Sequence, residues 1–224
     1  MEPRRLIPVD QLVERVWGAN TPRRGRATLH SYISRLRGRL AAAADTVEIV
    51  HRSGGYALLM DYARGNVDVR EFRILRSRAD DANEESQVVQ LLTDALALWR
   101  REPLTGLTGG WVEIERYRLR QERLAAEQVL ADAQLRSGQG EKIAADLAVR
   151  AAQHPLDERV AGQYMLALHQ AGRTADALEH YRKLRARLVE EVGTDPDAAL
   201  QYLFRGILTA DPALTPPRDW PQPA

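Results

Sequence analysis

The first part of the chain carries hydrophobic residues at helical spacing. Residues 10–17 place Leu12, Val13, Val16 and Trp17 at helical spacing, and Gly18 supplies a stop. Turn-forming residues follow over 19–25. A second helix is predicted over about 26–44, because its apolar residues repeat at intervals that share one helix face. These residues are Leu29, Ile33, Leu36 and Leu40.

The periodicity then changes from helical to strand-like. Residues 47–52 and 56–60 are β-prone runs on either side of Ser53, Gly54 and Gly55, which indicates a β-hairpin. Helix, turn, helix and hairpin follow one another in the order of a winged helix-turn-helix. The pattern is lost around residues 61–68. We therefore predict a winged helix-turn-helix DNA-binding domain over residues 1–64.

Beyond this boundary, helical periodicity dominates almost to residue 209. An amphipathic stretch over 91–99 is ended by Pro103, and a long helix is predicted over 114–135. Gly138 and Gly172 are separated by the length of one tetratricopeptide (TPR) repeat, and the same offset pairs apolar positions around them. Helix–turn–helix units of about 34 residues are typical of these repeats, although antiparallel helical hairpins in general would give a similar pattern.

The predicted fold class is therefore mainly α. A partial winged helix-turn-helix with a β-hairpin wing is followed by a TPR-like α-helical repeat domain over residues 65–210. Stacked helical pairs present a concave surface to other proteins and carry no chemistry of their own. Residues 211–224 contain five of the eleven prolines, and we predict that this tail is disordered.

Charge divides unevenly along the chain, although the whole chain carries only +1. Eleven arginines and six acidic residues give residues 1–64 a net charge of +5, and the remaining 21 basic and 25 acidic side chains give −4. No acidic residue occurs between Glu14 and Asp45, a stretch that holds seven arginines. A run of charge is often a solvated surface, but this one favours a polyanionic partner.

The side of the second helix opposite its apolar stripe carries small residues interleaved with arginine. Small side chains let a helix approach base edges, and arginine binds guanine or phosphate. Serine and arginine are common on any exposed helix, but such faces usually carry Glu and Asp as well. The candidate DNA-binding residues, including one arginine near the hairpin tip, are Arg23, Arg24, Arg26, Thr28, His30, Ser31, Ser34, Arg35, Arg37, Arg39 and Arg52.

Other classes of protein lack their signatures. Hydrophobic residues make up 44% and charged residues 28% of the chain, which is typical of a soluble globular protein. There is no cysteine, no HExxH motif, no phosphate-binding glycine loop and no GxSxG motif. No apolar run approaches the ~20 residues of a membrane span, and no secretory signal is visible. We therefore predict a cytoplasmic protein that is not an enzyme and that uses no cofactor or metal.

Several motifs resemble those of the Streptomyces antibiotic regulatory protein (SARP) type of transcriptional activator. In the first part these are LVERVWG (12–18), RATLHSYISRLR (26–37) and RSGGY (52–56), similar to an OmpR/PhoB-like winged helix. In the second part, the motifs resemble the bacterial transcriptional activator domain of the same family. They are ALALWRREPL (95–104), HPLDE (154–158), GRTADAL (172–178) and GTDP (193–196).

The resemblance implies a regulator that binds direct repeats in promoter DNA and contacts RNA polymerase, often at secondary-metabolite genes. It assigns the recognition-helix role to residues 26–37 and the wing role to residues 52–56. The helical half is implied to be the interaction module, with a homo-oligomer forming on DNA. No membrane partner is expected, because the chain has no apolar run long enough to span one.

The sequence departs from this family at its start, since the usual N-terminal strands and first helix of the winged helix are not seen before Leu6. The apolar stripe of the second helix is then expected to lack one of its covers. Two hypotheses follow. The chain is either a DNA-binding transcriptional activator, or a TPR-like interaction module whose truncated winged helix no longer binds DNA.

Overall fold

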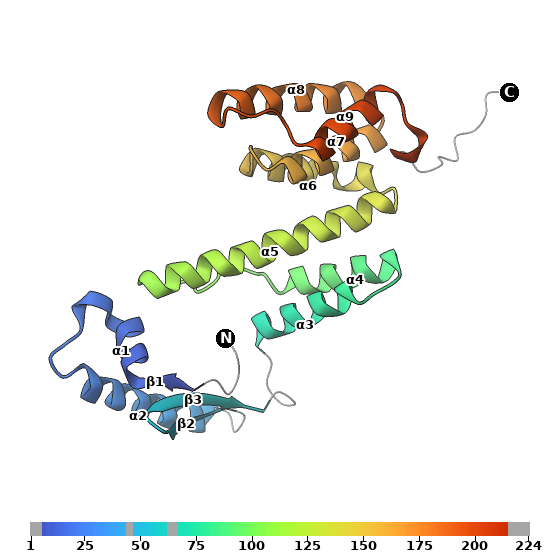
Figure 1. The fold of residues 1–224 in the computed structure, drawn as a ribbon. Helices are drawn as coiled ribbons and strands as arrows, with labels where there is room; N and C mark the ends of the chain where they lie inside the picture. Colours follow the sequence, from blue (N-terminus) through green and yellow to red (C-terminus); the bar gives the residue numbers. More distant parts are fainter. Residues whose placement is uncertain (1–5, 44–46, 62–66, 215–224) are drawn as a thin grey trace. The chain divides into compact units, whose positions relative to one another are not determined.

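The computed structural model describes residues 6–43, 47–61 and 67–214. The chain divides into two compact units, one made of residues 1–73 with 98–122 and the other of residues 74–97 with 123–224. The winged helix-turn-helix lies in the first unit, and the helical repeats lie in the second (Figure 1).

The winged helix-turn-helix contains two helices and a small antiparallel sheet. Its elements are β1 (Ile7–Pro8), α1 (Val9–Trp17), the 3-10 turn η1 (Gly18–Asn20), α2 (Gly25–Ala43), β2 (Val47–Arg52) and β3 (Gly55–Met60). The predicted helices and hairpin are confirmed to within one residue at nearly every boundary. The sheet order is β1-β3-β2, with Tyr56 of β3 opposite both Ile7 and His51. The sequence does not predict β1, because two residues are too few to show strand alternation.

The core of this part forms where α1 and α2 meet the sheet. Leu29, Ile33 and Tyr56 are buried, and residues of α1 and β2 pack around them. The predicted apolar stripe of α2 is only partly right. Leu29 and Ile33 are 4% and 7% exposed, whereas Leu36 is 49% exposed. The reason is that α2 packs mainly against α1 and β2, and Leu36 lies on a side of the helix that stays open to solvent.

The wing turn is built from two residues with positive φ. Ser53 and Gly54 have φ angles of 36° and 80°, the backbone form of a tight two-residue hairpin turn. At Gly55, an added Cβ would lie 2.5 Å from the backbone oxygen of Ile7, so only glycine lets β1 approach the hairpin this closely. The amide of Val9 donates to the Gly54 carbonyl at 3.1 Å. The start of α1 is thereby fastened to the wing turn.

The rest of the described chain is helical. Its elements are α3 (Asp68–Asp80), α4 (Glu85–Ala97), α5 (Gly110–Arg136), α6 (Gly140–Gln153), α7 (Glu158–Gln170), α8 (Thr174–Glu191), α9 (Ala198–Leu208) and the 3-10 turn η2 (Pro212–Leu214). The predicted long helix is α5, which begins at Gly110, earlier than expected. The amphipathic stretch before Pro103 ends sooner than expected, since α4 stops at Ala97.

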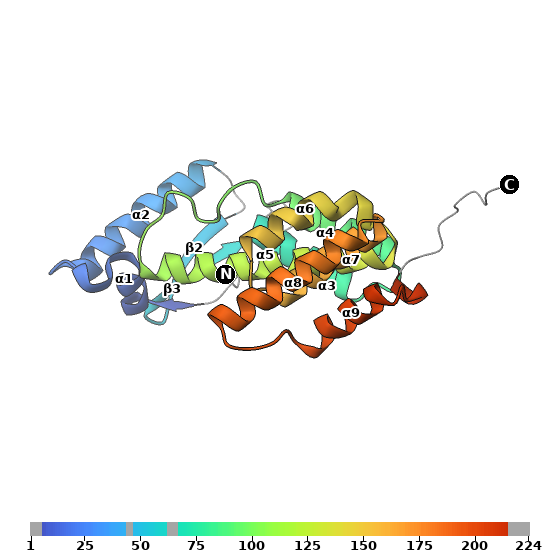
Figure 2. The ribbon, with the colours of Figure 1, turned by 90° about the horizontal axis from the view of Figure 1, so that it is seen from above.

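The sequence repeat corresponds to repeated geometry. The helix that follows each repeat glycine begins at the same offset from it, α6 at Gly140 and α8 at Thr174. Gly138 and Gly172 both have positive φ, at 70° and 79°. The hydrogen bond from Gln139 N to Gln134 O recurs one repeat later, from Arg173 N to Leu168 O. Figures 1 and 2 show α6, α7 and α8 stacked side by side. The TPR-like prediction is thus confirmed.

Two apolar clusters hold the repeats together. One joins α5, α6 and α7 around Leu135, Leu147 and Ala167. The other joins α7, α8 and α9 around Met165, Leu168 and Tyr181. Leu214 also packs against this second cluster, so the prediction of a disordered tail from residue 211 begins too early; residues 215–224 lie outside the described part.

Candidate nucleic-acid interface

The exposed side of α2 is the face that the sequence predicts to meet DNA. Leu29 and Ile33 anchor the helix from behind, and Ser31, Ser34 and Arg35 on the opposite side are exposed. A 19-residue helix of this kind is long enough to enter a major groove. The sequence of the helix contains no acidic residue, so its own side chains do not repel phosphate.

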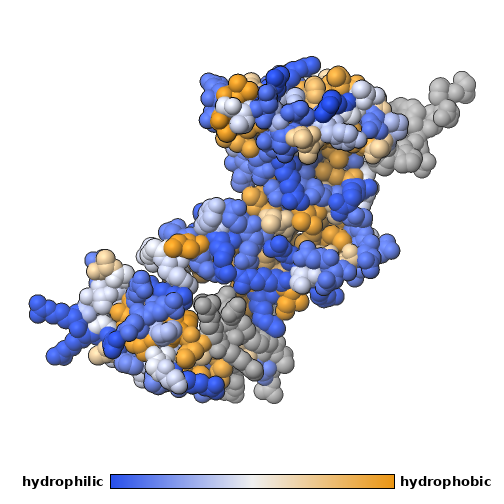
Figure 3. Space-filling view, viewed as in Figure 1, coloured by the Kyte–Doolittle hydropathy of each residue, from blue (hydrophilic) through white to orange (hydrophobic). Residues whose placement is uncertain are grey.

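Five of the candidate arginines are exposed, and their side chains make no hydrogen bond or ion pair with any residue that the structure describes. They are Arg23, Arg24, Arg35, Arg39 and Arg52. Four belong to α2 or the loop before it, and the fifth ends strand β2 at the wing. In Figure 3, hydrophilic side chains project from the loop that joins α1 to α2, at the left of the view. These cations are therefore available to an external anion.

Arg26 differs because it already has a partner. Its Nη2 lies 2.6 Å from Asp10 Oδ1, and its Nε donates to the same oxygen at 2.8 Å. The two side chains are 69% and 72% exposed, and pairs this open contribute at most about 1 kcal/mol. A phosphate can therefore compete with Asp10 for Arg26. Such binding would break the ion pair that joins α1 to α2.

Two further candidates, His30 and Arg37, connect α2 to the wing. His30 Nδ1 shares a hydrogen bond with the Tyr56 hydroxyl. Arg37 donates from Nε to the Ile49 carbonyl at 2.7 Å, and its guanidinium lies 5.7 Å from the centre of the Tyr56 ring. The His51 ring stands 4.9 Å from the same ring. Tyr56 is therefore the residue around which helix and wing are assembled.

The sequence analysis included Tyr56 only as part of the wing motif over 52–56, without a contact to the helix, and it did not select His51 as a candidate. The register of the hairpin is the feature that could have identified them, because it sets Tyr56 of β3 opposite His51 of β2. Thr28 and Ser31 are also engaged locally. Their hydroxyls donate to the carbonyls four residues earlier, at 3.1 Å and 3.2 Å, as is common for such residues inside helices. Both side chains are small enough to let the helix approach DNA closely. Each hydroxyl oxygen can still accept a hydrogen bond, but its proton is already donated to the helix backbone.

A family model described as the bacterial transcriptional activator domain matches residues 67–208. Regulatory protein DnrI of Streptomyces peucetius is 34% identical over 220 residues, which cover 93% of this chain and 80% of DnrI. The chain belongs to the SARP-type family of transcriptional regulators. Regulatory protein AfsR of Streptomyces coelicolor is 36% identical over 213 residues, which span 94% of this SARP-type regulator but 21% of AfsR.

A solved structure resembles this SARP-type regulator in fold. EmbR of Mycobacterium tuberculosis, in complex with a low-affinity phosphopeptide, matches with a TM-score of 0.86 at 27% identity, over 95% of this chain and 57% of that one. The part of this regulator that the structure describes contains no group of His, Cys, Asp and Glu able to hold a metal ion. No described helix is long and apolar enough to cross a membrane.

Proposed function

We propose that this regulator binds double-stranded promoter DNA through α2 and the wing, and activates transcription by engaging RNA polymerase. The observation that carries the proposal is the set of five exposed arginines, on and beside an acid-free helix, that have no partner among the described residues. The guanidinium groups of these arginines are free to bind an external polyanion. The resemblance to SARP-type activators adds secondary-metabolite genes as the targets and the cytoplasm as the location.

The chemistry of each side chain suggests its role. Arg35 lies on the side of α2 opposite Leu29, beside small residues, so it would read guanine O6 and N7 in the major groove. Arg24 and Arg39 lie toward the two ends of α2 and would bind phosphates on either side of the groove. Arg52 at the wing would contact a phosphate or the adjacent minor groove. His30 and Arg37 would hold the wing in position.

The resemblance also favours binding at repeated sites. One 19-residue recognition helix reads only a few base pairs, so a single copy gives limited specificity. Two or more copies on direct repeats would raise it. The helical repeats would provide the surface for contacts between copies or with RNA polymerase.

Selection from a pool of random duplexes tests the proposal. Full-length protein should enrich duplexes that share a repeated motif, and a variant with Arg24, Arg35 and Arg39 changed to Ala should enrich none. A matched variant with Lys142, Arg173 and Arg182 changed to Ala loses the same charge from exposed positions of α6, α8 and the turn before α8. It should select the same motif as the parent protein. Failure of the parent protein to enrich any motif contradicts the proposal.

The second candidate function is a TPR-like interaction module without DNA binding. The exposed Leu36 and Tyr32, at 49% and 44%, favour it, because an incompletely covered recognition helix is less rigidly held. This function predicts no shift of any duplex at low salt, together with capture of a protein partner by the full chain. The selection experiment therefore separates the two functions.

A further inference from the structure

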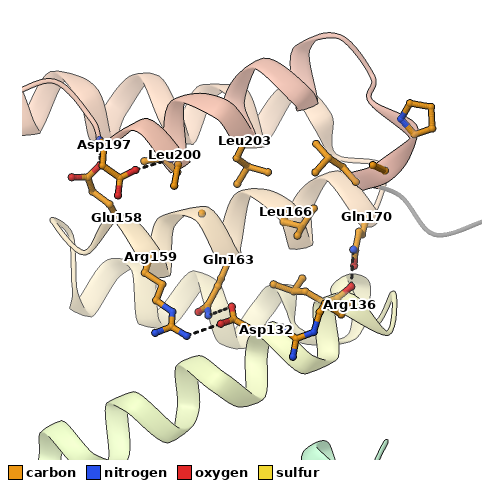
Figure 4. Close-up of a pocket in the computed structure, with 16 residues that line it drawn as sticks. Asp132, Arg136, Glu158, Arg159, Gln163, Leu166, Gln170, Asp197, Leu200 and Leu203 are labelled. Atoms are coloured by element: carbon orange, nitrogen blue, oxygen red, sulfur yellow. Dashed lines mark hydrogen bonds and ion pairs between the residues drawn. The ribbon is translucent and has the colours of Figure 1, made fainter. Parts of the chain in front are cut away.

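The helical repeats contain a groove that plays no part in the proposed DNA contact. It has a volume of about 820 Å³ and runs between the end of α5, the length of α7, and α9 with η2 (Figure 4). All of its lining residues belong to the second compact unit. Its chemistry differs along its length.

The middle of the groove is apolar. Leu166 of α7, Leu203 of α9 and Leu214 of η2 line it and are only partly buried. Gly162 keeps this section open, since an added Cβ would lie 3.4 Å from Leu200 Cδ1 and 3.6 Å from Leu203 Cδ2. Leucine side chains that remain partly open to water favour an apolar occupant.

One end of the groove is acidic. Glu158 Oε2 accepts the amide of Asp197 at 2.6 Å, and Asp197 Oδ1 accepts the amide of Leu200 at 2.7 Å, so the two carboxylates meet at the start of α9. Figure 4 shows both side chains at the same end of the groove. Neither carboxylate is paired with a cation among the described residues.

The other charges in the groove are already neutralised. Arg159 lies 2.6 Å from Asp132, and Arg136 lies 2.6 Å from Glu85. Glu158 and Asp197 are offset only by the backbone amides at the starts of α7 and α9, with no cation among the described residues. An occupant that complements them carries a cation at this end.

The groove also contains a buried acceptor that lacks a donor. Gln163 is 4% exposed, and its Nε2 donates to Gln128 O at 2.8 Å and to Asp132 Oδ1 at 2.6 Å. Its Oε1 has no hydrogen-bond partner among the described residues. Buried acceptors are normally satisfied. This oxygen has almost no accessible surface, so a peptide N–H in the groove reaches it only if the Gln163 side chain turns toward the occupant.

We infer that this groove binds a short extended segment of a partner protein, with an arginine or lysine at the Glu158–Asp197 end and leucine-like side chains over the apolar middle. From Glu158 to Gln170, α7 rises roughly 18 Å. An extended chain covers this length with about five or six residues. The inference does not depend on DNA binding, because no groove residue belongs to the winged helix.

Short labelled peptides test the inference on the full-length protein. The probes are fluorescein-labelled, C-terminally amidated hexapeptides of the sequences Arg-Ala-Leu-Leu-Ala-Leu and its reverse, which allow for either chain direction. Matched peptides carry Glu in place of Arg. In fluorescence anisotropy, at least one arginine peptide should bind, and its glutamate counterpart should bind about tenfold more weakly or not at all.

A charge-removing variant locates the binding. Glu158→Gln with Asp197→Asn keeps both side-chain acceptors, and Asn still caps a helix as Asp does. This double variant should bind the arginine peptide about tenfold more weakly, because a charge-assisted contact is lost. The control, Glu141→Gln with Asp146→Asn, removes the same charge from exposed positions of α6 and should bind as the parent does.

Four outcomes would overturn the inference. They are the absence of binding by both arginine peptides up to about 1 mM, equal binding of the arginine and glutamate peptides, unchanged binding by the double variant, and a dimer in sedimentation that only the double variant loses. The last outcome would make the groove an interface between copies of this chain. Because duplex binding is measured separately, loss of DNA binding leaves this test unaffected.

Discussion

At the scale of single residues, the arginines of α2 differ in whether their guanidinium groups already have hydrogen-bond or ion-pair partners within the protein. Arg26 and Arg37 have partners within the protein, whereas Arg35 has none among the described residues and stands on the exposed side of the helix. A free guanidinium that faces solvent can form its strongest contacts only with an external anion or base edge. Arg35 is therefore the sharpest single test of the DNA-facing side.

Arg35→Ala should impair DNA binding without unfolding the protein. If Arg35 reads a base, the variant loses ~1–3 kcal/mol of preference for the selected motif; if it binds phosphate, the salt slope falls by about one unit. Fluorescence anisotropy on the selected duplex, repeated over a salt series, separates the two. Lys142→Ala removes one exposed charge from α6 and serves as the control. Unaltered affinity and slope for Arg35→Ala would show that another face meets DNA.

Two glycines of the winged helix should respond oppositely to alanine. Gly55→Ala brings a Cβ to 2.5 Å from the Ile7 carbonyl oxygen, so β1 has to move, and we expect a loss of about 1–3 kcal/mol in stability. Gly38→Ala meets nothing within 4 Å on α2 and should gain roughly 0.5–1 kcal/mol from helix propensity. Thermal unfolding followed by circular dichroism measures both. A Gly55→Ala variant as stable as the parent would mean that β1 does not pack there.

At the scale of elements, the turns between helices depend on buried polar side chains from a neighbouring helix. Gln170 at the end of α7 is 6% exposed, and it bridges the α5–α6 turn. Its Oε1 accepts the amide of Gly140 at 2.9 Å, and its Nε2 donates to the Leu135 carbonyl at 2.9 Å. The side chain therefore gives the Gly140 amide its partner, and it adds a second donor to the Leu135 carbonyl, which also accepts the amide of Gly138 at 2.9 Å.

Gln170→Ala should destabilise the repeats by about 1–3 kcal/mol, because the Gly140 N–H would lose its partner while still buried, although the Leu135 C=O keeps the bond from Gly138 N. Urea unfolding measures the loss, and hydrogen exchange should show faster exchange at the Gly140 amide. Gln153→Ala, at the exposed end of α6, is the control and should change stability little. Equal stability of the two variants would exclude this role for Gln170.

On α8, His180 should make the repeats less stable in mild acid. Burial lowers the pKa of its imidazole, and the charges of Lys183 and Arg187 lower it further. The unfolded chain, with a pKa near 6.5, therefore takes up the proton first, so stability is lost as the pH falls through about 6.5. Urea unfolding at pH values of about 7.5 and 5.5 should show this loss, and His180→Gln should reduce it. His154→Gln, at an exposed site, should not. An identical pH response in all three proteins would contradict the prediction.

The elements that could be predicted are those that local sequence signals specify. The Gly138 and Gly172 turns were found because the same residue pattern produces the same cap in both repeats. The sequence led us to expect that the apolar stripe of α2 lacks one of its covers. That Leu36 is the residue left exposed was not predicted, because periodicity identifies an apolar face without showing which of its positions are covered. The groove was also beyond sequence analysis, since Glu158 and Asp197 meet only through the packing of α7 against α9.

At the scale of the whole molecule, the uneven distribution of charge sets how the protein responds to salt. Residues 1–64 carry +5 and the remaining residues −4, so the overall charge of +1 conceals the attraction of one part for a polyanion. Fields of opposite sign on one chain favour binding of DNA by the basic part alone. The salt dependence of DNA affinity should therefore be set by the number of arginines that lack a partner among the described residues. It should not depend on the net charge of the chain.

The number of those arginines sets the salt slope that we expect. Each phosphate neutralised on duplex DNA contributes a slope of about −0.9 to log K against log salt, so the five arginines predict a slope of about −4 to −5 if all of them bind phosphate. Arg35 at a base edge would bring it to about −3.6. Anisotropy on the selected duplex over a series of potassium chloride concentrations measures the slope. A slope near zero would exclude phosphate contact as the source of affinity. A slope much steeper than −5 would show that basic residues other than these five also bind phosphate.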